Sequence, residues 1–125
     1  KLEDRTVLVI QDGEKTAIRR RPSRGLLAGL YELPNLLGHL TREEVLDKVK
    51  NMQLEPLYIE KLPDAKHIFS HIEWRMTGYL IRVAALDTDR GLPFIFAEKK
   101  QSEKQYAIPS AFRAYVKYMK EESGK

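Results

Sequence analysis

An acidic group is the first set of side chains whose types and spacing could do chemistry. Glu43, Glu44 and Asp47 occupy neighbouring positions of a predicted helix, since residues four apart share a helix face. Together they could hold Mg²⁺ against a phosphate group. The alternative is a helix N-terminus enriched in acids, which the helix dipole favours. We favour this second interpretation.

The segment around Ser70 carries the second set. His67 and His71 are four residues apart, a spacing that would pair them on a helix for metal binding, but the segment has the pattern of a strand. It offers neither an acid nor a third histidine at ligand spacing, and Ser70 does not stand on a strand–turn–helix elbow of the serine hydrolase type. Phe69 could wedge into DNA or could anchor the loop from beneath. We favour the anchor, and we expect no metal site.

Arginines form the third set, in the run Arg19–Arg21 followed by Arg24. On a strand, Arg19 and Arg21 face one way and Arg20 the other. Arg21 and Arg24 could contact phosphates of a nucleic acid. Alternatively, the run is solvated charge at a sheet edge, which prevents aggregation. The sequence leaves both interpretations open.

Composition sets the limits on these possibilities. The 125 residues are 42% hydrophobic and 32% charged, a mixture that favours one folded domain over residues 1–125 and argues against disorder. The absence of cysteine excludes disulfides, thiolate catalysis and iron–sulfur clusters, and we expect no cofactor within this chain. A net charge of +4 permits a polyanionic partner without requiring one. Without a membrane-spanning run or a signal-peptide pattern, we expect a cytoplasmic protein.

Periodicity then predicts the elements that position these groups. Thr41 and Glu44 form a capping box for a helix over residues 42–52, and Asp12-Gly13 is typical of a hairpin turn. Pro109 suits the first turn of a final helix with an apolar stripe. The predicted strands cover residues 5–11, 16–21, 54–62, 66–71 and 73–86, and residues 87–94 are predicted to form a loop. The order of elements favours an α+β fold, a mixed sheet with helices on two sides.

Three segments together carry a family resemblance: residues 21–34, including the run GLLAGLYELP, residues 66–74, KHIFSHIEW, and residues 107–112, AIPSAF. The chain resembles the C-terminal domain of the adenine DNA glycosylases of the MutY family, which implies a Nudix-like fold. True Nudix hydrolases place a Glu six residues after a Gly, followed by an Arg-Glu pair and further acids that bind Mg²⁺. Gly38 and Glu44 fit this spacing, but Met52 and Gln53 occupy the Arg-Glu positions. Counting from Gly29 instead places Asn35 at the Glu position, so pyrophosphate hydrolysis is not expected.

The resemblance implies a role in base excision repair, in which double-stranded DNA carrying an 8-oxoguanine:adenine mispair is the partner. Adenine excision and a 4Fe–4S cluster belong in that family to an N-terminal catalytic domain, which would be the second partner of this chain. The chain itself would then be non-catalytic. The resemblance places the loop of Phe69, Ser70 and His71 against 8-oxoguanine, with Ser70 contacting the base. Ser23 and Arg24 are weaker candidates for contacts with the DNA backbone.

Ordinary hydrogen-bond chemistry is consistent with that assignment. Oxidation at C8 turns guanine N7 from an acceptor into a donor and adds a carbonyl oxygen, and a serine hydroxyl can accept from N7–H. Because hydroxyls rotate, discrimination needs a second, fixed group near the new oxygen, such as a backbone N–H.

Two rival functions remain open. One is a Nudix-type hydrolase of a nucleoside diphosphate derivative, with Glu32, Glu43, Glu44 and Asp47 as metal ligands. The other is a protein-docking module that uses an exposed loop at residues 87–97. The apolar cluster of that loop, Leu92, Phe94, Ile95 and Phe96, is equally compatible with another strand, which we prefer.

Overall fold

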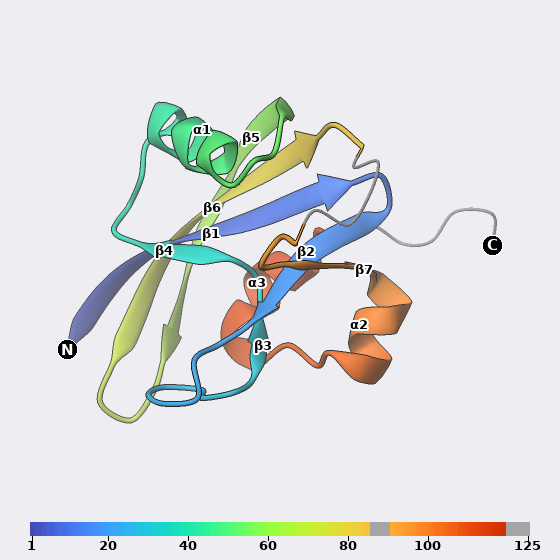
Figure 1. Cartoon of the computed structure of the whole chain (residues 1–125). Coiled ribbons are helices and arrows are strands. Elements are labelled where there is room, and N and C mark those ends of the chain that lie inside the picture. Colours follow the sequence, from blue (N-terminus) through green and yellow to red (C-terminus); the bar gives the residue numbers. More distant parts are fainter. Residues whose placement is uncertain (86–90, 120–125) are drawn as a thin grey trace.

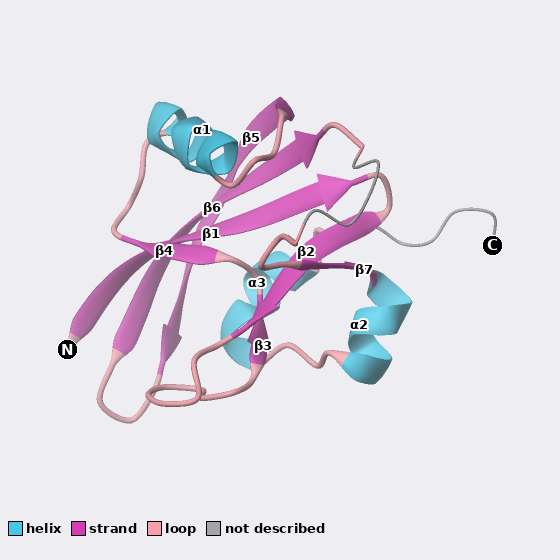
Figure 2. Ribbon diagram, viewed as in Figure 1, coloured by secondary structure: helices cyan, strands magenta, loops and turns pink. Residues whose placement is uncertain are grey.

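A computed structural model describes residues 1–85 and 91–119 of the chain, and within them it has the predicted α+β architecture (Figure 2). The strands are β1 (Leu2–Asp12), β2 (Lys15–Arg20), β3 (Tyr31–Glu32), β4 (Asn35–Leu37), β5 (Pro56–Ile68), β6 (Glu73–Val83) and β7 (Ile95–Glu98). The helices are α1 (Arg42–Asn51), α2 (Lys99–Gln105) and α3 (Arg113–Val116), and the 3₁₀ turn η1 (Ser110–Phe112) leads into α3. No helix in the described ranges is both long and apolar enough to cross a bilayer.

Two long parallel strands, β1 and β6, form the centre of a mixed sheet (Figure 1). The strand order is β3-β2-β1-β6-β5, while β4 pairs with β1 and β7 with β2. All pairings other than that of β1 with β6 are antiparallel. The central strands are apolar on both faces because both faces are covered, as the sequence predicted for residues 73–86.

Helices cover the two faces of the sheet separately (Figure 1). α1 packs on one face through Val45 and Val49, and η1 and α3 pack on the other through Phe112 and Tyr115. Alternate residues of β1 therefore enter different cores. Val7 and Val9 face η1 and α3, and Leu8 and Ile10 face α1.

The capping box predicted for α1 is confirmed. The Thr41 hydroxyl accepts from the N–H of Glu44, and the Glu44 carboxylate accepts from the N–H of Thr41. The last helical residue is Asn51, one position before the expected end.

Residues 54–71 were expected to form two strands, and this prediction is wrong. β5 is one strand that runs through Pro63, and its register with β6 shifts between Leu62 and Ala65. The irregularity leaves Pro63 outside the ladder, so its missing N–H costs no interstrand hydrogen bond. Since β5 pairs only with β6, it lies at the edge of the sheet, where proline is tolerated.

The C-terminal third differs from expectation in several places. α2 was not predicted, because residues 99–105 are charged and lack an apolar stripe. The predicted final helix begins as the 3₁₀ turn η1 and continues as the short α3, with the expected apolar stripe against the core. β6 ends at Val83 rather than at residue 86, which lies outside the described residues together with residues 87–90.

The suggestion of an exposed docking loop is wrong for the described part of residues 87–97. Residues 95–98 form β7, and the four apolar side chains of the cluster are partly buried. Three of them, Leu92, Phe94 and Phe96, pack against the α1-side core. The preferred alternative, another strand, is confirmed for Ile95 and Phe96, whereas Leu92 and Phe94 precede β7.

α3 is held to the sheet by a close approach of Tyr115 to Gly78. A methyl group added to Gly78 would overlap the Tyr115 ring. The Tyr115 hydroxyl lies 2.9 Å from the carbonyl oxygen of Pro63 and 3.3 Å from that of Met76, and donates into this pair of acceptors. Burial raises the pKa of this phenol, so the group stays protonated and remains a donor. Only glycine at position 78 leaves room for this arrangement.

Gly78→Ala is therefore expected to lower the free energy of unfolding by about 1–3 kcal/mol, the usual cost of overpacking. Urea denaturation of Gly78→Ala, Tyr115→Leu and the double variant measures the coupling between the two positions. The double variant should lose less stability than the sum of the single variants, because the smaller side chain at position 115 relieves the overlap. Additive losses would contradict the close packing.

Candidate functional site

Residues 69–72, which we call the hairpin tip, connect β5 to β6 and carry the principal predicted site residues. The N–H of Phe69 donates to the carbonyl oxygen of Ile72 at 2.7 Å and closes the turn. Ser70 and His71 are both exposed. In the described part of the chain, their side chains and backbone N–H groups have no hydrogen-bond partner within the protein. The tip therefore presents free donors and acceptors to solvent.

Phe69 is half-buried beneath the tip, as expected for an anchor. Its ring meets the Trp74 ring edge-on, with centroids 5.1 Å apart, and lies 4.7 Å from the His67 ring. The same side chain packs against the core under α3. A ring held in this way fixes the turn to the body of the protein and leaves Ser70 and His71 as the outermost groups.

Trp74 is the buried residue that receives Phe69. The exposed fraction of its side chain is 0%, and its indole N–H donates to the Glu3 carboxylate at 2.8 Å. The guanidiniums of Arg5 and Arg21 lie over its ring, at 4.8 and 5.4 Å from the centroid. Residues of β1 and of the segment after β2 thus pack around the tryptophan that anchors the hairpin tip.

Glu32 is a buried carboxylate that both interpretations of the arginine run overlooked. It accepts from Nε of Arg19 at 2.9 Å, from Nη1 of Arg21 at 2.6 Å, and from the Asn35 amide at 2.8 Å. Arg19 and Arg21 are therefore neither solvated edge charges nor free to contact phosphates. The predicted alternation is confirmed, because Arg20 turns away from Glu32 and donates to the carbonyl oxygen of Gly29. The sequence signal for Glu32 is an acid enclosed by apolar residues in Tyr31–Pro34.

Ser23 and Arg24, the weaker candidates, are exposed on the loop of residues 22–30. This loop is closed by hydrogen bonds from Gly29 N–H to the Pro22 carbonyl oxygen and from the Arg21 guanidinium to that of Leu26. Leu26 and Leu27 of this loop pack against the same core as Phe69. In Figure 1 this loop and the hairpin tip both lie along the lower edge of the molecule.

The acids proposed as metal ligands do not come together. Glu32 is occupied by two guanidiniums, and Glu44 bonds back to the N-terminus of its own helix. Across the described residues no three His, Cys, Asp or Glu side chains are grouped so that they could hold a metal ion. The ligand set of Glu32, Glu43, Glu44 and Asp47 is therefore wrong, since Glu32 lies on β3 apart from the three acids of α1, and both Glu32 and Glu44 have other partners.

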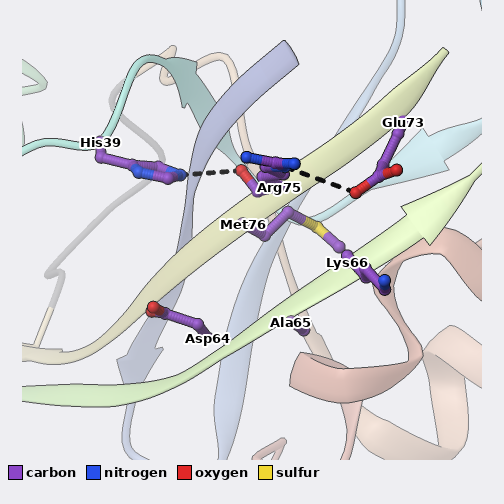
Figure 3. A pocket seen from close by; sticks show the side chains of 7 residues that line it. All are labelled: His39, Asp64, Ala65, Lys66, Glu73, Arg75 and Met76. Atoms are coloured by element: carbon purple, nitrogen blue, oxygen red, sulfur yellow. Dashed lines mark hydrogen bonds and ion pairs between the residues drawn. The ribbon is translucent and has the colours of Figure 1, made fainter. Parts of the chain in front are cut away.

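A pocket of about 430 Å³ lies beside the β5–β6 hairpin and contains charges of both signs (Figure 3). Nε2 of His39 lies 2.9 Å from the carbonyl oxygen of Arg75, and Nε of Arg75 lies 3.4 Å from the Glu73 carboxylate. The hydrogen bond from Lys61 lowers the pKa of the Asp64 carboxyl below its ordinary value. Because its charged groups other than Lys66 already have partners, this pocket indicates no particular ligand.

Solved structures with the same fold have two kinds of description. The C-terminal domain of mouse MUTYH, solved in complex with human PCNA, is 18% identical with a TM-score of 0.70, and the match covers 98% of this chain and 93% of that one. A NUDIX hydrolase from Nitrosomonas europaea is 12% identical with a TM-score of 0.63, covering 98% and 94%. A MutT protein from Methanosarcina mazei is 13% identical with a TM-score of 0.63, covering 94% and 92%. At these identities the likeness establishes the fold.

The sequence itself identifies the family. The pattern of the NUDIX domain family matches residues 6–118, which include β1, the hairpin tip and α3. This chain belongs to the NUDIX domain family.

Proposed function

We propose that this chain is the lesion-recognition domain of an A/G-specific adenine DNA glycosylase of the MutY type, acting in base excision repair. The hairpin tip would contact 8-oxoguanine opposite the adenine to be excised. Excision would be performed by a separate N-terminal domain carrying a 4Fe–4S cluster, and residues 1–125 would be a single, non-catalytic domain. The observation that carries the proposal is the exposed Ser70-His71 pair on a turn anchored through Phe69 to Trp74.

The free groups of the tip match the changes that oxidation makes in guanine. The Ser70 hydroxyl can accept from N7–H of 8-oxoguanine, a donor that guanine lacks. The backbone N–H groups of Ser70 and His71, which have no acceptor within the described residues, could supply fixed donors for the new carbonyl oxygen at C8. Together they distinguish the oxidised base better than a rotating hydroxyl alone, and the anchored turn reduces the entropy lost on binding.

Hydrolysis of a nucleoside diphosphate derivative is the second candidate, because hydrolases share this fold and family. Against it stands the arrangement of acids, in which the described residues form no group able to hold a metal ion. Hydrolysis of this kind relies on Mg²⁺ held by carboxylates. We therefore rank it below lesion recognition.

Ser70→Ala/His71→Ala, introduced into the complete glycosylase, should reduce the preference for excising adenine opposite 8-oxoguanine over adenine opposite guanine. A good base contact contributes about 1–3 kcal/mol of discrimination, so the ratio of the two excision rates should fall roughly tenfold. Single-turnover assays on the two duplexes measure this ratio. His39→Ala, a histidine away from the tip, serves as the control and should leave it unchanged. An unaltered ratio in the double variant would refute the role of the tip.

Phe69→Ala should weaken lesion preference although Ser70 and His71 are retained, because the turn loses its contact with Trp74. Trp74 is the only tryptophan in the chain, so its fluorescence emission reports directly on the anchor. We expect the emission maximum to move to longer wavelength as water reaches the ring. Phe94→Ala, on the α1 side of the sheet, is the matched control and should leave the emission unchanged. A tip that keeps its preference without Phe69 would show that the anchor is dispensable.

Incubation of the chain with Mg²⁺ and a panel of nucleoside di- and triphosphates, including 8-oxo-dGTP, tests the second candidate. We expect no phosphate release above that of a protein-free sample, with an active MutT enzyme as the positive control. Sustained turnover that is abolished by chelation would replace lesion recognition with hydrolysis as the preferred function.

A further inference from the structure

A second pocket, of about 390 Å³, separates β5 from η1 and α3 and is lined by cationic side chains. Its rim carries a hydroxyl and four basic groups, and its floor is formed by Met76, Ala111 and Ala114. Among the residues that the structure describes, no carboxylate lines it. We call it the basic groove, defined by its rim: Lys66, His67, Ser110, Arg113 and Lys117.

The charges of the basic groove lack counter-charges. Within the described residues, Lys66, Arg113 and Lys117 form no ion pair with a carboxylate. Arg113 begins the short helix α3 and Lys117 is its C-cap, four residues on, a spacing that brings the two like charges near each other. Lys117 contacts only the face of the Tyr118 ring, at 5.5 Å. The positive charges of this grouping repel one another, and an anion would relieve that repulsion.

The basic groove is held in a fixed shape. Tyr115 lies in the sequence between Arg113 and Lys117, and its hydroxyl bonds to backbone oxygens of β5 and β6 while its ring packs on Gly78. Met76 and Ala111 in the floor are 2% and 3% exposed. The cations of α3 are thus kept opposite those of β5, and an anion entering the groove finds its partners already in position.

The basic groove adjoins the hairpin tip. His67 lines the groove, and its ring contacts the Phe69 ring that anchors the tip. A DNA strand that presented a base to Ser70 and His71 could therefore reach this groove with a neighbouring phosphate. His67 is the only aromatic ring in the lining, so the groove offers little surface for stacking a base.

We infer that the basic groove binds a backbone phosphate of the DNA strand that carries the lesion. The inference rests on the proposed function. It adds to the base contact of the hairpin tip a second contact with the DNA, which depends on the phosphate charge and not on the identity of the base. Arg113 and Lys117 would donate charge-assisted hydrogen bonds to the phosphate oxygens, and Ser110 would add a neutral one. The groove fixes the position of the strand, while the tip examines the base.

Duplex binding by the complete 125-residue chain tests this assignment. The probes are two fluorescein-labelled duplexes of one sequence, one containing an 8-oxoguanine:adenine pair and the other guanine:adenine, measured by anisotropy from low to moderate salt. Amide chemical shifts of the ¹⁵N-labelled chain map the contact. The test variant is Arg113→Gln/Lys117→Gln. The matched control is Lys48→Gln/Lys50→Gln, which removes two exposed positive charges from α1.

The groove variant should bind both duplexes roughly tenfold more weakly at low salt, with the ratio of the two affinities unchanged. The slope of log K against log salt should fall by about 0.9, the value for one phosphate contact, and the shifts of residues 110–117 should disappear. A groove variant no weaker than the control, or an unaltered chain with no DNA-dependent shifts in residues 110–117, would overturn the inference.

Failure of the proposed function gives a different result. In that case the two duplexes bind equally and Ser70→Ala/His71→Ala changes nothing, while the groove variant still lowers affinity and salt slope. If the tip variant loses lesion preference and the groove variant has no effect, the inference about the groove is refuted and the proposed function stands.

Discussion

The contact between the buried Trp74 ring and its neighbours determines how this edge of the molecule is built. An indole in a protein interior needs an acceptor for its N–H, and Glu3 supplies it from β1. Edge-on rings of Phe69 and Phe112 pack against Trp74, and guanidiniums lie over its face. β1, the hairpin tip and η1 therefore all contact the Trp74 side chain. These contacts fix the orientation of the hairpin tip.

A buried carboxylate extends this constraint to the neighbouring loop. Glu32 is 2% exposed, and the cost of removing its charge from water is offset by two guanidiniums and an amide. Asn35, one of these partners, also accepts a hydrogen bond from Arg5 at 2.7 Å, and Arg5 lies over Trp74. The loop of residues 22–30 and the hairpin tip thus share one connected support. The α1 side of the sheet, packed mainly by aliphatic side chains, takes no part in it.

Sequence reasoning succeeded where the determinants are local. The capping box of α1 lies within four residues, and the doubly apolar character of β1 and β6 is visible in each strand alone. It failed where partners are distant in the chain. The burial of Glu32 depends on its ion pairs with Arg19 and Arg21. β5 can continue through Pro63 because it lies at the edge of the sheet. The basic groove forms only where residues 66–67 meet residues 110–117. Exposure of Ser70 and His71 was expected from the resemblance, whereas their role in binding remains a proposal.

The contact between Gly78 and Tyr115 has an evolutionary consequence. Because the ring occupies the space that any side chain at position 78 would need, the glycine cannot be replaced while the ring is present. Lineages that acquire a bulkier group in the central strand must first, or simultaneously, shrink the aromatic residue in the terminal helix. The two positions should therefore show correlated substitution among relatives, and a descendant that lost the ring would also be free to lose the glycine.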